Sequence, residues 1–191
     1  KASHKLVEHG FTADRSSVIV STTHVHAAPT LVGIWGTSTA TADGRAYLKR
    51  VNDAVVAAVD IAASRLRTSE LWTATGSVRS MVWQNGQGTN HPDGFPVDER
   101  MPVLWGRDPD TGATNALYVN VPNHPDQFDG AKNLQFSADV PGYVRKALGA
   151  TIGGTSVIAS GTLGRQEPPG AIDDYSEVER QGQFVTNAIQ L

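Results

Sequence analysis

Three short apolar runs in this sequence each lead directly into a tight polar turn, and this pattern strongly constrains the fold. The runs cover residues 18–20, 116–121 and 155–160 and are rich in valine and isoleucine, which favour strands. We expect the first run to be a buried strand. The first two runs lead into turns with histidine and proline, and the third leads into a glycine-rich turn. Because sites in α/β proteins gather where strands end, these turns are candidates for a functional site.

Helical patterns alternate with the apolar runs. In these stretches apolar residues recur every three or four positions, which indicates amphipathic helices. The alternation predicts an α/β fold, a mixed β-sheet flanked by helices. The expected elements are helices over about 44–67, over 142–148 and after Asp173 or Asp174, a strand region over 70–82, and a hairpin of strands 101–105 and 116–121 with its turn at 108–112.

The composition excludes several classes of function. The 191 residues are 39% hydrophobic and 18% charged, which is typical of one globular domain. With a net charge of −3 and scattered basic residues, the chain has no signature of nucleic-acid binding. No apolar run approaches the roughly 20 residues that a transmembrane helix needs. The chain has no cysteine, so a metal would bind His, Asp, Glu or Tyr, which favours zinc or another borderline or hard divalent ion.

The first turn contains a His-x-His pair, His24 and His26. In an extended chain these side chains would lie on one face, about 6.6 Å apart along the strand. Neutral imidazole is the commonest protein ligand for zinc and also the usual proton shuttle near neutral pH. A third histidine, His124, stands at the end of another expected strand. The residues alone also allow these histidines to be polar or surface groups at turns.

Two other residues admit both a structural and a functional interpretation. Arg79 has apolar neighbours, so it is either an edge residue whose charge reaches solvent or a clamp for an anion or carbonyl. His91 lies in a loop rich in glycine, asparagine and proline, and we interpret it as solvated.

Five segments, taken together, resemble the N-terminal catalytic domain of the neutral, non-lysosomal ceramidases. Ser-Thr-Thr-His-Val-His-Ala-Ala-Pro is similar to the family's Ser-Ala-Thr-His-Thr-His-Ser-Gly/Ala-Pro, and Ser-Ala-Asp-Val-Pro-Gly-Tyr to its Ser-Ala-Asp-Phe-Pro-Gly-Tyr. These enzymes are zinc-dependent amidases that cut the N-acyl bond of ceramide. The five segments occur in the family's order and cover residues 21–29, 78–80, 97–104, 120–125 and 137–143.

The resemblance implies a partial zinc site. The family's zinc ligands correspond to His24 and His124, His26 to a histidine that handles protons or binds substrate, and Arg79 to an arginine that lines the pocket. The family completes its site with a glutamate and a tyrosine that would follow Leu191. We therefore expect 1–191 to be one partial ceramidase-like domain, completed by the remainder of a longer chain or by a partner chain.

One turn departs from the family pattern. Where the family has Gly-Asp/Asn-x-Ser-Pro-Asn, with a serine that takes part in the reaction, this chain has Glu167 at the serine position and Arg165 at the position of the acid or amide. Glu167 is a candidate base or substitute metal ligand. The replacement also fits a loss or change of ceramide hydrolysis.

These observations leave four functional hypotheses. The first is a zinc-dependent hydrolase that cleaves the amide bond of a lipid-like N-acyl substrate, secreted or located in the periplasm or at the cell surface as the resemblance implies. The second is a ceramidase-like domain without that activity, serving as a binding or structural component of a larger assembly. The third is a metallohydrolase of another amide or ester. In the fourth, the histidines are structural and the likeness to the family is misleading.

Overall fold

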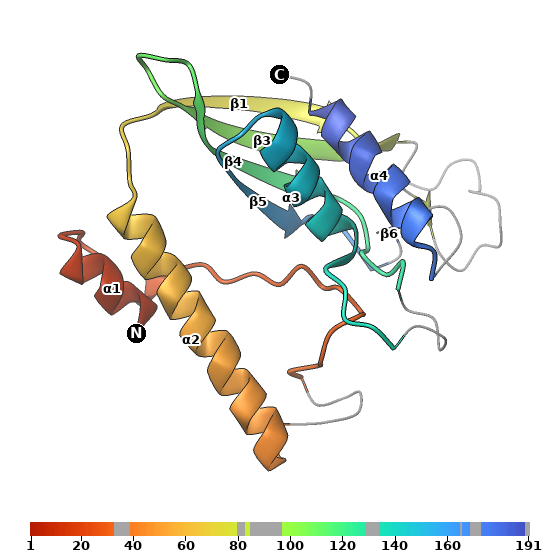
Figure 1. Ribbon diagram of the computed structural model, residues 1–191, viewed down its shortest axis with the longest axis horizontal. Helices are drawn as coiled ribbons and strands as arrows, with labels where there is room; N and C mark the ends of the chain where they lie inside the picture. The colour runs from red at the N-terminus through yellow and green to blue at the C-terminus, as the bar shows by residue number, and fades with distance from the viewer. Residues whose placement is uncertain are drawn as a thin grey trace. The chain divides into compact units, whose positions relative to one another are not determined.

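The computed structural model divides the chain into two compact units (Figure 1), which we describe separately. The first unit is Lys1–Val20 with Pro29–Arg67, and the second is Ser21–Ala28 with Thr68–Leu191. The expectation of one ceramidase-like domain stays a prediction. The structure describes residues 1–32, 39–79, 83–84, 97–128, 134–164, 166–168 and 173–189.

The first unit consists of helices. Helix α1, Ala2–Glu8, packs on α2, Ala42–Ser64, and a short 3₁₀ turn, η1, covers Arg15–Ser17. The predicted helix over 44–67 is confirmed, although it begins and ends slightly earlier. Thr41 caps it, with its hydroxyl oxygen accepting a hydrogen bond from the Gly44 backbone N–H at 3.0 Å.

The prediction of a buried strand over residues 18–20 is wrong. These residues belong to no helix or strand, and Ile19 is 92% exposed. A β-branched run favours an extended backbone, but it becomes a buried strand only where another strand and a core cover it. The backbone of His24 is also left-handed, with φ of 59°, so the predicted extended strand with His24 and His26 on one face does not form.

The second unit contains a mixed sheet of four strands in the order β1-β3-β4-β5. The first three strands pair antiparallel, and β5 runs parallel to β4. A separate pair joins β2, Trp83–Gln84, to β6, Gln166–Glu167. The predicted hairpin and the strand over 155–160 are confirmed. The four strands are β1 Glu70–Ser77, β3 Arg100–Arg107, β4 Thr114–Val121 and β5 Thr155–Ser160.

Two helices lie side by side along one face of this sheet (Figure 1). Helix α3, Asp139–Thr151, is the crossover that parallel strands β4 and β5 require, and α4, Tyr175–Ala188, packs against it. Of the two candidates Asp173 and Asp174, Asp174 caps α4 and accepts a hydrogen bond from the Ser176 backbone N–H at 2.9 Å. Within the described residues, no helix combines the length and apolar character needed to cross a membrane. The core between sheet and helices includes Val103, Leu117, Val119, Val144, Leu148, Val178 and Val185.

The contact between α3 and α4 depends on a glycine. A Cβ at Gly182 would lie 2.7 Å from Cβ of Tyr143, whereas a Cβ at Gly149 would meet no atom within 4 Å. Helix propensity alone favours alanine over glycine by about 1 kcal/mol. We therefore expect Gly149→Ala to raise the free energy of unfolding and Gly182→Ala to lower it, by urea denaturation. Stabilisation by both changes would contradict the close helix crossing.

Candidate metal centre

Three histidines converge in the second unit. His24 and His26 come from the segment 21–28, and His124 comes from the turn that follows β4. Their ring centroids are 5.1 Å apart for His24–His26, 4.8 Å for His24–His124 and 4.9 Å for His26–His124. The Nε2 atoms of His26 and His124 lie 3.1 Å apart. Each ring offers a nitrogen within 4.8 Å of the others, so the group could hold a metal ion.

The segment that carries His24 and His26 is held at both ends by hydrogen bonds. At one end, Ser160 in the last position of β5 donates from Oγ to the Thr23 carbonyl at 2.9 Å. At the other end, the Ser137 backbone N–H donates to the Ala27 carbonyl at 3.0 Å. Ser160 belongs to β5 and Ser137 lies two residues before α3, and both elements pack on the core, so the core helps to determine where these two histidines lie.

The position and ring orientation of His124 are set by the turns after β4 and β5. Its backbone N–H donates to the Gln166 carbonyl at 2.8 Å, and its Nδ1 lies 2.8 Å from the Gly164 carbonyl oxygen. Because a carbonyl can only accept, Nδ1 carries the proton, and in the neutral ring Nε2 keeps its lone pair on the side of His26. The side chain is only 11% exposed.

Two carboxyl groups lie beside His124. Asp126 and Glu167 each place an oxygen within 4.8 Å of a His124 nitrogen and of one another. Burial raises the pKa of Asp126 to about 6, the Glu167 carboxylate adds to the rise, and His124 opposes it. Glu167 is among the predicted site residues, whereas Asp126 is not. The signal that could have found Asp126 is its place two residues after His124, in the same proline-rich turn.

The surroundings also favour the neutral form of His24. Partial desolvation lowers the pKa of this imidazole, although the residue is exposed, and the proximity of His124 and His26 lowers it further. A neutral imidazole has a free lone pair, which is the form that binds a metal ion.

The ion pair that the structure gives Arg79 is with an acidic residue. Arg79 follows β1 closely, its side chain is exposed, and its Nε lies 3.7 Å from a Glu99 carboxylate oxygen. In the described part of the chain, no hydrogen bond, ion pair or ring contact links it to the histidine group. Its role as a pocket arginine therefore stays a prediction. Arg165 and His91 lie outside the described residues.

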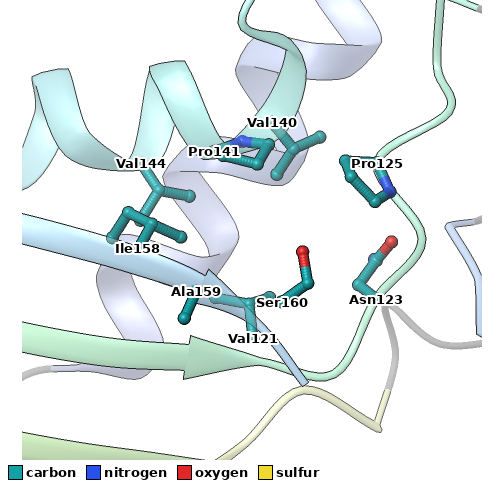
Figure 2. A pocket seen from close by; sticks show the side chains of 9 residues that line it. All are labelled: Val121, Asn123, Pro125, Val140, Pro141, Val144, Ile158, Ala159 and Ser160. Carbon is teal, nitrogen blue, oxygen red and sulfur yellow. The ribbon is translucent and has the colours of Figure 1, made fainter. Parts of the chain in front are cut away.

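A small cavity borders the turn that carries His124 (Figure 2). Its walls are mostly apolar, and the side-chain oxygen of Ser160 points into it, with that of Asn123 near its edge. It has room for about one water molecule, so it is a gap in the packing of α3 on β5 and not a substrate pocket of its own. The lining residues are Val121, Asn123, Pro125, Val140, Pro141, Val144, Ile158, Ala159 and Ser160.

Comparison with known proteins supports a fold assignment. No protein-family model and no curated protein sequence matches the chain. Among solved structures, neutral ceramidase from Pseudomonas aeruginosa matches 73% of this chain with a TM-score of 0.61 and 19% sequence identity. A structure described as ceramidase complexed with C2 matches 87% of this chain with a TM-score of 0.64 and 20% identity. The fold is ceramidase-like.

This likeness confirms the predicted mixed α/β sheet flanked by helices. At 19% and 20% identity it establishes the fold alone. The chain spans 25% of the length of the first ceramidase chain and 29% of the second. The histidine group lies within this ceramidase-like fold.

Proposed function

We propose that this chain carries the metal-binding histidines of a zinc-dependent hydrolase that cleaves the amide bond of an N-acyl, ceramide-like substrate. The observation that supports the proposal is the convergence of His24, His26 and His124 from two segments about 100 residues apart. The ceramidase-like fold supports the substrate class.

The donors fit a zinc ion. A catalytic zinc takes three protein ligands and leaves one position open, and imidazole is among its preferred donors. The 3.1 Å between Nε2 of His26 and Nε2 of His124 is close to the about 3.3 Å that separates two nitrogens bound to one tetrahedral zinc. We propose His24 and His124 as ligands. His26 is placed to be the third ligand, and the family resemblance alternatively gives it a role in proton transfer.

A bound zinc ion would polarise the substrate carbonyl and lower the pKa of a bound water to about 7. The chain's own residues would hold the geometry and move protons. The Gly164 carbonyl keeps Nε2 of His124 available as a donor atom. Glu167, beside His124, is our candidate for accepting a proton from the attacking water, and Arg79 for contacting the substrate.

One observation favours a second candidate function. Glu167 occupies the position where the ceramidase pattern has a reactive serine, so the chemistry of this turn differs from that of the family. A hydrolase of another amide or ester, or a ceramidase-like domain that binds without catalysis, would be compatible with that replacement. Residues from the remainder of a longer chain or from a partner chain, and a location outside the cytoplasm, are further proposals that rest on the resemblance.

Metal content and turnover of the purified full-length protein test the proposal together. We expect about one zinc per chain by elemental analysis, and release of fatty acid from N-acyl sphingosine that stops on chelation and returns with zinc. A panel of N-acyl amines and simple esters serves as the comparison.

The outcomes separate the candidate functions. Zinc with turnover of a different panel member would favour the other hydrolase, and zinc with no turnover would favour the binding component. Absence of bound metal after reconstitution would exclude the metal centre.

A further inference from the structure

The side chain of Gln166 joins three separate turns. It is 6% exposed, in the two-residue strand β6. Its Oε1 accepts a hydrogen bond from the Asp98 N–H at 2.7 Å. Its Nε2 donates to the carbonyls of Asp98 at 3.0 Å, Pro122 at 3.1 Å and Thr162 at 3.4 Å. The amide therefore links the segment before β3 to the ends of β4 and β5.

These bonds flank the two contacts that hold His124. Pro122 stands two residues before His124, and Thr162 stands two residues before Gly164, whose carbonyl accepts from His124 Nδ1. The Gln166 backbone carbonyl itself accepts from the His124 N–H at 2.8 Å. One buried residue thus contacts the backbone of His124 and the segments that lead into His124 and Gly164.

We propose that Gln166 is a positioning residue, which fixes the place of His124 and, through Gly164, the tautomer that leaves Nε2 free for a metal. The inference rests on the proposed metal centre for its functional meaning. A glutamine suits this place because its amide both accepts and donates hydrogen bonds. The groups around it are one N–H, which needs an acceptor, and three carbonyls, which need a donor. Without the amide, buried polar groups of these turns lose their partners, and the turns rearrange to satisfy them.

The test compares Gln166→Met with a matched control. Methionine has a similar length but cannot replace the amide bonds. The control is Gln181→Met, which removes another fully buried glutamine amide, one that donates to Glu177 on α4. Cobalt(II) absorption titrations measure metal affinity, and nitrogen NMR of the metal-free protein reports the tautomer of His124.

We expect Gln166→Met to weaken Co²⁺ binding about 10- to 100-fold, as changes behind a metal ligand commonly do. We also expect the His124 ring to shift from the Nδ1–H form to a mixture of tautomers. Gln181→Met should change neither the Co²⁺ affinity nor the His124 tautomer, even if it lowers the thermal stability as much as Gln166→Met does. If Gln166→Met is unfolded, Gln166→Asn replaces it, because asparagine keeps the amide on a shorter side chain.

Two results would overturn the inference. One is a Gln166 variant that keeps the wild-type Co²⁺ affinity and the wild-type His124 tautomer. The other is a Gln181→Met control that loses as much Co²⁺ affinity and shows the same change of tautomer. If the wild-type protein itself binds no Co²⁺, the proposed metal centre fails, and the tautomer measurement alone decides whether Gln166 positions His124.

Discussion

His124→Ala is expected to remove the proposed zinc ion from the protein and to abolish the proposed hydrolytic activity. The ring centroid of His124 lies within 4.9 Å of those of both other histidines. The Gly164 carbonyl holds the His124 ring in the tautomer whose Nε2 can bind a metal. Changes behind a ligand cost 10- to 100-fold in metal affinity or activity, so we expect loss of the ligand itself to cost more than about 100-fold. Elemental analysis and fatty-acid release from N-acyl sphingosine measure the two effects.

The control for this substitution is His4→Ala. His4 is exposed on α1, in the other unit of the chain, so its loss should leave zinc and activity unchanged. We expect His24→Ala to cause the same loss of zinc and activity as His124→Ala. Stoichiometric zinc and full turnover in His124→Ala would contradict the metal centre.

Leu117→Ala is expected to produce the largest loss of stability that we predict for a single side chain. Leu117 is 1% exposed, lies on the inner strand β4 and belongs to the core beneath α3 and α4. Truncating a buried leucine removes its transfer free energy and leaves a cavity, at a cost of about 2–5 kcal/mol. Urea denaturation measures the free energy of unfolding. Because β4 leads into the turn of His124, weaker zinc binding should accompany the loss.

Leu104→Ala provides the matched control on the neighbouring strand. Leu104 is on the other inner strand, β3, but its side chain points to the opposite face of the sheet and is 41% exposed. We expect a loss below about 1 kcal/mol, because much less apolar surface leaves the core. Equal losses from the two leucines would contradict a core confined to the face beneath α3 and α4.

Local patterns predicted most of the secondary structure. The run over 155–160 forms β5, and residues 101–105 and 116–121 lie within the hairpin strands. The helix expected after Asp173 or Asp174 forms as α4 and buries Val178 and Val185 on one face. These predictions succeeded because the periodicity of apolar residues and helix capping depend only on a few neighbouring residues.

The prediction for residues 18–20 failed because burial is not a local property. All three residues of this run are β-branched, against three of the six in β5, yet Ile19 is exposed. A strand needs a partner for its backbone and a core for its side chains. His24 and His26 therefore meet by way of a left-handed residue and not through the alternation of a strand.

The sequence by itself determined the types of groups available to the site: histidines and carboxylates in proline- and glycine-rich turns, with no cysteine. Local patterns also indicated the alternation of strands and helices. Local patterns could not predict that His124 meets His24 and His26, that Glu167 lies beside it, or that Gln166 joins the surrounding turns. These contacts span about 40 to 100 residues of chain, and sheet pairing and core packing, not neighbouring residues, bring such distant segments together. Asp126 is the exception, because it lies two residues after His124 in the same turn.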